Sequence, residues 1–208
     1  MPKNQQIINK KRVLWNARKL FFGFGYSKVT MDELAFDLNM SKRTLYQLYK
    51  SKNELLEAVI SDFFQEFQDS INDIINRKNN GALTSLKQII FLIQEQITIF
   101  SIHAFEDIRK NNPEAWQMIS TLREKMFNNQ LREVLEQAKK EDIIRADIDV
   151  EIIVLLILNS IQSVVNPEVI SRLPYSTEEV IEMFSKFIIS GIIKTKNDTI
   201  VESLSSKK

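Results

Sequence analysis

The sequence predicts an all-α protein in which three short N-terminal helices precede a larger helical bundle, about nine helices in total. Glycine and proline occur only four times each in 208 residues, which disfavours tight turns and favours long helices. Apolar side chains recur with a period near 3.6 between short polar breaks. Several of these periodic segments begin with a serine, threonine or asparagine, as capped helices do.

The first fifty residues carry the three short helices. The first presents an apolar face and ends at the glycine-containing break 23–28. A threonine and a glutamate three residues apart, at 30 and 33, form a capping box that begins a second helix reaching about residue 38. Ser41 caps a third helix that reaches about residue 48. The face of the first helix consists of Leu14, Ala17, Phe21 and Phe24.

Residues 51–208 form the expected body, joined to the 1–50 head by a long helix over 52–76. Asn112 before Pro113 and the capping box at 176–179 mark further helix starts. The run Ile152–Leu158 is compatible with a buried strand, but its apolar continuation through Val165 favours a helix of about sixteen residues. Helices are also expected over 82–101, 113–140 and 177–194.

The composition of the chain limits the kinds of function that it can have. The chain has no cysteine, which excludes disulfides and thiolate metal sites. Its N-terminus lacks the apolar core of a signal peptide, and its longest apolar run is too short to span a bilayer, so we expect a soluble cytoplasmic protein without membrane contact. Residues 1–60 hold eleven Lys/Arg and five Asp/Glu, a net +6, whereas the remainder is −5. A basic head suits binding to phosphate, although a mixed solvated surface gives the same count.

The segment 30–49 predicts a helix-turn-helix. Ala35 is small enough for two helices to cross closely, and Asn39 tolerates the left-handed backbone of a tight turn. Leu45 would pack the second helix onto the first, leaving the polar side chains of 42–47 directed outward, where they could reach a DNA major groove. A helical hairpin with a solvated basic face is the alternative interpretation.

In order and spacing, this region resembles the tetracycline-repressor (TetR) family from about Ile7 to Val59. The matching stretches are 17–26, which ends in Gly25-Tyr26, then Thr30–Ala35, and then Ser41–Leu56. The sequence departs from the family at Asn39 and Arg43, where glycine is frequent. It departs again at Leu48-Tyr49, which replaces an aromatic pair ending in phenylalanine.

The resemblance implies a sequence-specific transcriptional regulator that binds double-stranded operator DNA, as a repressor released by a ligand. Residues 42–44 and 47 would lie in or beside the major groove, while Thr30, Tyr46 and Lys52 would contact phosphates. The implied DNA-binding residues are Thr30, Ser41, Lys42, Arg43, Thr44, Tyr46, Gln47, Tyr49 and Lys52.

The body is expected to dimerise through its last two helices. The run 152–158 is apolar on every side, so something must cover it; a partner subunit and complete burial within one chain are both possible. The resemblance implies a four-helix interface between two subunits, and hence a near-palindromic operator. The expected interface residues are Ile153, Leu156, Ile157, Ile161, Phe184, Phe187, Ile188 and Gly191.

The resemblance also implies a pocket among the middle helices for a small, mainly apolar effector, although core packing explains the same residues. The candidates are Phe100, His103, Phe105, Trp116, Met118, Phe127, Asn159 and Gln162. An enzyme is disfavoured because the chain has one histidine, no glycine-rich phosphate loop and no metal-ligand cluster. We therefore expect no catalytic residue, cofactor or metal. A helical adaptor that binds protein instead of DNA is the remaining alternative.

Overall fold

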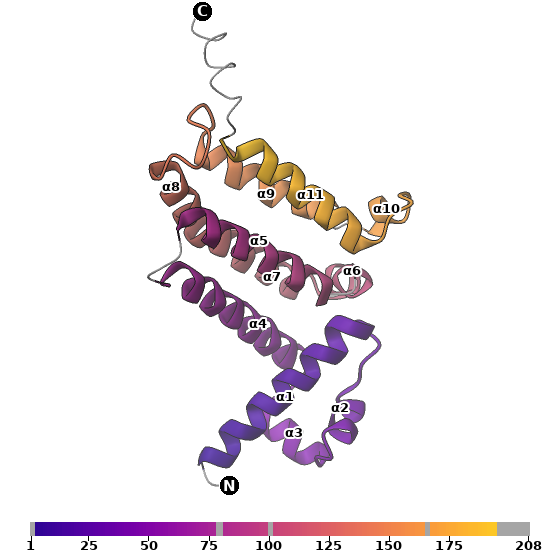
Figure 1. The fold of residues 1–208 in the computed structure, drawn as a ribbon. Helices are drawn as coiled ribbons and strands as arrows, with labels where there is room; N and C mark the ends of the chain where they lie inside the picture. The colour runs from indigo at the N-terminus through magenta and orange to yellow at the C-terminus, as the bar shows by residue number, and fades with distance from the viewer. Residues whose placement is uncertain (1–2, 78–80, 100–101, 165–166, 195–208) are drawn as a thin grey trace, which may run out of the picture. The chain divides into compact units, whose positions relative to one another are not determined.

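The all-α prediction is confirmed. The computed structural model describes residues 3–77, 81–99, 102–164 and 167–194, and within them eleven α-helices and one π-helical segment follow one another (Figure 1). These described ranges contain no strand, only an isolated bridge between Ile144 and Ile193. The helices are α1 (Lys3–Phe24), α2 (Met31–Asp37), α3 (Lys42–Leu48), α4 (Lys52–Ile75), α5 (Ala82–Ile99), α6 (Ile102–Asn111), α7 (Pro113–Met126), η1 (Phe127–Leu131), α8 (Arg132–Lys140), α9 (Val150–Val164), α10 (Pro167–Ile170) and α11 (Thr177–Ile192).

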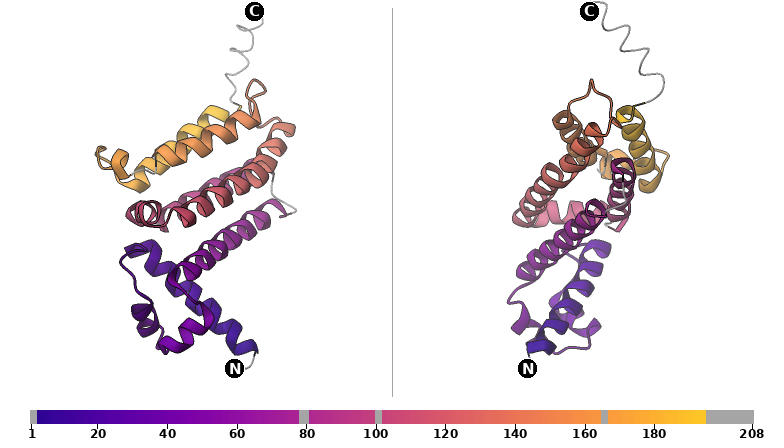
Figure 2. Two further views of the ribbon diagram at one scale, coloured as in Figure 1. Left: turned by 180° about the vertical axis from the view of Figure 1, so that it is seen from behind. Right: turned by 60° about the vertical axis from the view of Figure 1, so that its left-hand side comes forward.

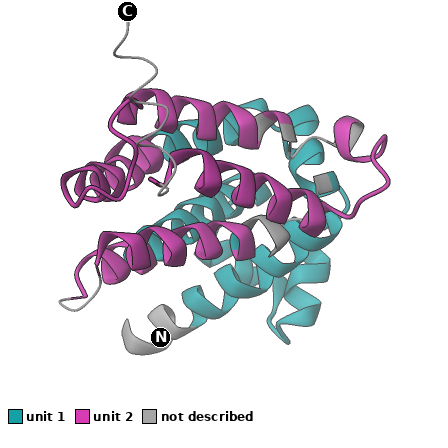
Figure 3. Ribbon diagram, turned by 45° about the horizontal axis from the view of Figure 1, so that its top comes forward, with its two compact units in different colours: residues 1–69, 96–124 teal, residues 70–95, 125–208 magenta. Residues whose placement is uncertain are grey.

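The chain divides into two compact units (Figure 3). Unit 1 comprises residues 1–69 and 96–124, and unit 2 comprises residues 70–95 and 125–208. Unit 1 thus joins the N-terminal head to a later segment of the chain, which no sequence signal indicated. The expected boundary at residue 50 concerns a functional division and stays a prediction.

The core of unit 1 is made by α1, α2, α3 and the first part of α4, together with α6 and α7. Phe21, Leu34, Leu45 and Leu55 are completely buried in it. The apolar face predicted for the first helix is confirmed at Ala17 and Phe21. It is wrong at Phe24, which is 66% exposed because the helix ends there and Gly25 turns the chain away with φ +103°.

Helix α6 packs against α1 in unit 1 and fixes the loop that follows α1. The Asp107 carboxylate accepts hydrogen bonds from the Ser27 backbone N–H at 2.6 Å and from the Ser27 hydroxyl at 2.5 Å. A Cβ on Gly25 would lie 3.1 Å from the same carboxylate, so a glycine permits this close approach as well as the turn. The entry to α2 is therefore held by a residue some eighty positions away.

In unit 2, α9 is the central helix. It contacts α8, η1, α10 and α11, and α11 runs alongside it in both views of Figure 2. The end of α11 is tied to the link between α8 and α9 by a bond from Lys194 N–H to Ile143 O at 2.8 Å. The run 152–158 is helical, as the sequence favoured.

Two features of the region 102–140 were not predicted. The first concerns the expected helix 113–140. It is interrupted by the π-helical segment η1, where Gln130 donates from Nε2 to Asn72 Oδ1 at 2.9 Å. Residues 102–111 form a separate helix, α6, in the interval between the expected helices 82–101 and 113–140. Of the helices that the structure describes, none combines the length and apolarity required to cross a membrane.

Candidate nucleic-acid interface

The turn between α2 and α3 has the geometry that the sequence predicted. Asn39 adopts φ +48°, and its N–H donates to Phe36 O at 2.9 Å. The next N–H, of Met40, donates to Ala35 O at 2.9 Å, which completes the Schellman arrangement at the end of α2. The Arg12 side chain also donates to the carbonyl of Leu38. These bonds satisfy the carbonyls at the end of α2 and set the direction in which α3 begins.

Helix α3 begins at a well-formed cap. The Ser41 hydroxyl accepts from Thr44 N–H at 3.0 Å, and α3 then buries one side chain completely, that of Leu45. Because seven residues make only two turns, burying Leu45 directs the other side of the helix to solvent. The exposed residues of this cap and helix are Ser41, Lys42, Arg43, Tyr46 and Gln47.

The exposed cations of α3 make few and weak interactions within the protein. Lys42 Nζ lies 2.5 Å from Asp32 Oδ2, but both side chains are largely exposed, and exposed pairs of this kind contribute little stability. Within the described part of the chain, neither Arg43 nor Gln47 makes a hydrogen bond or ion pair. Both side chains can therefore engage a partner without breaking an internal contact.

An open groove of about 520 Å³ lies beside α3 in unit 1. It runs between the start of α2 and the link from α3 to α4, so it is continuous with the exposed face of α3. Three of the residues expected to contact phosphates line it. The full lining is Val29, Thr30, Met31, Asp32, Tyr46, Lys50, Ser51 and Lys52.

Lys52 is the most constrained cation of this groove. Its ammonium lies 4.2 Å from the centroid of the Tyr26 ring. Partial burial lowers the pKa of Lys52, while the carboxylates of Asp107 and Glu33 oppose that change. The Tyr26 hydroxyl bonds in turn to Asn53, whose side chain also accepts from Asn112 Nδ2 at 3.3 Å. The charge is thus held at a fixed place on the groove wall.

Thr30 is already engaged in the predicted capping box. Its hydroxyl accepts from Glu33 N–H at 3.1 Å and donates to Glu33 Oε2 at 2.9 Å, while its own N–H donates to the same carboxylate at 2.7 Å. These bonds lower the pKa of Glu33. A phosphate at Thr30 would therefore have to share or replace the Glu33 carboxylate.

Tyr49 lies in a different place from the other expected DNA contacts. It is only 6% exposed and belongs to the core of unit 1, where burial raises the pKa of its hydroxyl. The Lys10 ammonium stands 6.0 Å from the centroid of its ring. Most of the Tyr49 side chain is therefore unavailable to a duplex, whereas the exposed neighbour Tyr46 lines the groove.

The expected effector-pocket residues are distributed over both units. In unit 1, Phe105 and Trp116 make an edge-on contact with centroids 6.2 Å apart, and Met118 packs against the same core, while His103 is exposed. In unit 2, Phe127 is buried and Asn159 is exposed. Phe100 and the side chain of Gln162 lie outside the described residues. Among the described candidates, a direct contact is thus shown between Phe105 and Trp116.

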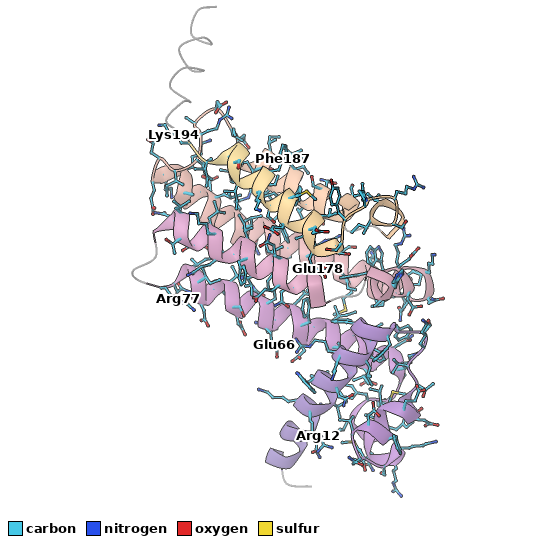
Figure 4. All side chains as sticks on the ribbon, turned by 45° about the vertical axis from the view of Figure 1, so that its right-hand side comes forward. Arg12, Glu66, Arg77, Glu178, Phe187 and Lys194 are labelled. Atoms are coloured by element: carbon cyan, nitrogen blue, oxygen red, sulfur yellow. The ribbon has the colours of Figure 1, made fainter. Side chains whose placement is uncertain are left out.

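The expected dimer residues fall into three groups in unit 2. Ile153 and Ile157 are buried within the single chain, whereas Leu156 and Phe187 are 55% and 74% exposed. Phe187 projects from α11 in Figure 4. Ile161, Phe184 and Ile188 are half-buried, and a Cβ on the exposed Gly191 would meet nothing within 4 Å. On α9 and α11, further exposed apolar residues that the sequence did not predict at the interface are Ile152, Leu155 and Met183.

A family model matches the part of the chain that builds the helix-turn-helix. The family model described as "Bacterial regulatory proteins, tetR family" matches residues 13–59, which include all of α2 and α3. The HTH-type transcriptional regulator YvaF of Bacillus subtilis is 29% identical over 182 residues, covering 88% of this chain and 94% of that protein. IcaR of Staphylococcus epidermidis, the negative regulator of a biofilm operon, is 29% identical over 82 residues, covering 39% of this chain and 43% of IcaR.

Solved structures share the fold. A TetR transcription regulator from Haloarcula marismortui has a TM-score of 0.70 at 19% identity, covering 89% of this chain and 99% of that one. FadR from Bacillus subtilis, solved with stearoyl-CoA, has a TM-score of 0.66 at 19% identity, covering 88% and 98%. The family and these relatives are transcriptional regulators rather than enzymes. The tetR-family match lies on the residues that build the helix-turn-helix, and a regulator aligns over nearly its whole length, so this chain is similar to bacterial transcriptional regulators of the TetR family.

Proposed function

We propose that this regulator is a repressor that binds a near-palindromic operator as a homodimer and leaves it when a small, mainly apolar ligand binds. The observation that carries the DNA-binding part is the exposed face of α3. Its polar side chains are free or weakly paired, while Leu45 anchors the helix to a rigid core. A short helix with this division is suited to lie in a major groove.

The contacts divide into two classes. Arg43 and Gln47 have the side-chain geometry for bidentate bonds to guanine and adenine respectively, so we assign base recognition to them together with Lys42 and Thr44. Tyr46 and Lys52, on the wall of the groove beside α3, are suited to the phosphate backbone. Phosphate contacts would fix the register of the protein, and base contacts would select the sequence.

A homodimer is supported by the exposed apolar side chains of α9 and α11. Leu155, Leu156 and Phe187 leave more than half of their surface exposed in the single chain. Where such exposed apolar side chains form one patch, that patch marks an association site more often than a free surface. A two-fold dimer would present two α3 helices to half-sites about 34–36 Å apart, which is why we expect a near-palindromic operator.

Repression and release by ligand are inferred from relatives. IcaR is named a negative transcriptional regulator, and FadR of Bacillus subtilis was solved with stearoyl-CoA. A similar regulator from Saccharomonospora viridis was solved with choline. In this chain the paired rings of Phe105 and Trp116 supply apolar surface in unit 1 that suits a ligand. Release requires that the ligand bind the DNA-free conformation more tightly than the DNA-bound one.

The test is fluorescence anisotropy with duplexes from the protein's own promoter and with random duplex, over a range of salt concentrations. We expect binding that weakens steeply with salt, because phosphate contacts release counterions. The triple variant Lys42→Ala, Arg43→Ala and Gln47→Ala should lose preference for the promoter. A charge-matched triple on exposed residues outside the head, Arg77→Ala, Lys87→Ala and Gln117→Ala, should keep it. Absence of binding to every duplex at low ionic strength would refute the proposal and favour a protein-binding adaptor.

A further inference from the structure

Two arginines of unit 1 are half-buried, but only one of them has partners. The Arg18 guanidinium lies 3.1 Å from Asp62 and 2.7 Å from Glu66, so two carboxylates balance its charge. Arg123, on α7, makes no ion pair or hydrogen bond within the described residues. Its Nε and Nη2 atoms are both buried and lack an acceptor. Of these two half-buried cations, the first is balanced by carboxylates and the second is not.

A guanidinium with two buried nitrogen atoms that lack an acceptor is costly. Burying a charge without a partner is among the least favourable arrangements in a protein, and natural cores rarely contain one. Burial lowers the pKa of Arg123, and no charged group of the described chain offsets that change. Glu124 is adjacent in sequence, but neighbouring positions on a helix do not face each other. Either the cation has a role that requires this state, or an acceptor arrives from outside the chain.

The two orphaned atoms have a specific geometry. Nε and Nη2 lie along one edge of the planar guanidinium, so their N–H bonds point in nearly the same direction. That edge matches the two oxygens of a carboxylate or a phosphate and forms the bidentate pair that arginine makes with such groups. Both atoms are covered in the ligand-free chain, so an anionic oxygen group could occupy the unsatisfied positions only after neighbouring side chains move aside.

The same face of α7 offers an apolar surface. Trp116 and Arg123 are seven residues apart, which is nearly two helical turns, so both lie on one face with an axial separation of about 10 Å. Trp116 is half-buried against Phe105. A molecule with an anionic end at Arg123 and an apolar body about 10 Å long could contact both residues.

We propose that Arg123 is the anchor for the anionic oxygen group of the effector, and that this effector is an amphipathic acid, a carboxylate or a phosphate ester with an apolar body. The proposal rests on the proposed function only in naming the ligand as the effector. The binding itself is a property of unit 1, and it can be measured without DNA.

The first measurement is the melting temperature of the ligand-free protein. Arg123→Met keeps the length of the side chain and removes the charge. If the guanidinium is unbalanced in the free protein, this variant should melt at least about 2 °C higher than the wild type. The control variant Arg77→Met removes an exposed arginine and should leave the melting temperature within about 1 °C. A lower melting temperature for Arg123→Met would mean that the guanidinium has a structural partner, and would overturn the proposal.

The second measurement uses four probes with the same eight-carbon chain: octanoate, octyl phosphate, octanamide and octyltrimethylammonium. At saturation, octanoate or octyl phosphate should raise the melting temperature of the wild type by about 5 °C or more. Which of the two acts at lower concentration distinguishes a carboxylate effector from a phosphate one. The neutral amide and the cation should have less than a third of this effect.

The variants decide whether Arg123 causes the preference. Arg123→Met should abolish the advantage of the anionic probes, Arg123→Lys should keep part of it, and Arg77→Met should keep all of it. Binding can be followed independently through Trp116 fluorescence in a Trp15→Phe background, since Trp15 is the other tryptophan and is exposed. Equal response to charged and neutral probes, no response to any probe, or an unchanged preference in Arg123→Met would each refute the assignment. Loss of DNA binding alone would refute the proposed function and leave this result intact.

Discussion

Helix α3 in unit 1 and helix α9 in unit 2 both leave side chains exposed, but exposure has opposite consequences for the two. On α3 the exposed groups are polar or charged, and water solvates them at little cost. On α9 they are Ile152, Leu155 and Leu156, and each Å² of apolar surface left in water forgoes about 25 cal/mol. The polar surface of α3 is therefore stable in the absence of DNA. The apolar surface of α9 favours association of subunits whether or not DNA is bound. The comparison predicts permanent pairing of subunits and reversible binding of DNA.

The largest expected effect comes from placing charge on the apolar surface. The double variant Leu156→Glu and Phe187→Glu should be monomeric in analytical ultracentrifugation, because four carboxylates would be buried in the dimer. Operator affinity should fall by about 100-fold or more, since two linked heads bind far more tightly than one. Phe91→Glu, on an exposed phenylalanine of α5, should leave both properties unchanged. If the double variant keeps the mass of two chains, the dimer interface lies elsewhere on the protein.

A smaller effect is expected on the polar surface. Arg43→Ala should weaken binding to the operator by roughly 10- to 100-fold, or about 1–3 kcal/mol, because a bidentate contact to a base is lost. Binding to random duplex should change much less. Lys19→Ala, an exposed cation of α1, serves as the control in anisotropy titrations. If specific and random binding fall by the same factor, Arg43 contacts phosphate instead of a base.

Lys52 should behave differently from Arg43 because it lies in the groove rather than on the exposed face of α3. Lys52→Gln should weaken binding to all duplexes alike and lower the slope of log affinity against log salt by about 1 per subunit. Lys87→Gln, in unit 2, is the control. A change in sequence preference with an unchanged salt slope would contradict the division between base and phosphate contacts.

The sequence predicted the helix starts because their signals are local. The boxes Thr30–Glu33 and Ser176–Glu179 and the cap at Asn112 all form as expected. The left-handed turn at Asn39 was also predicted, but the one at Asp142, φ +57°, was not. Asn39 stands at the turn of the helix-turn-helix, where glycine is frequent. Asp142 follows α8 and belongs to no such pattern.

What the sequence did not predict depends on contacts between distant residues. The position of Tyr49 in the sequence predicts a DNA contact, but its ring is buried in the core of unit 1. Arg12 was counted with the basic charges of the head, yet it bonds the end of α2. The π-helical turn η1 and the inclusion of 96–124 in unit 1 also lack local signals. Arg123 is ordinary in the sequence, and only its two buried, unpartnered nitrogen atoms distinguish it.

The smallest expected effect concerns pH at the start of α2. Bonds from Thr30 lower the pKa of Glu33 in the folded state, so the stability that its carboxylate contributes is present above the unfolded pKa of about 4.3 and is lost as the pH falls through the folded value. Glu33→Gln removes this titration while keeping a side chain that can complete a capping box. The melting temperature of the wild type should therefore exceed that of Glu33→Gln at pH 7, and the difference should shrink as the pH approaches 3. Glu57→Gln, at an exposed carboxylate of α4, should show no such convergence. A constant difference across this range would mean that Glu33 acts on α2 by shape rather than by charge. The cap would then be as indifferent to ionisation as the aliphatic surface of α9.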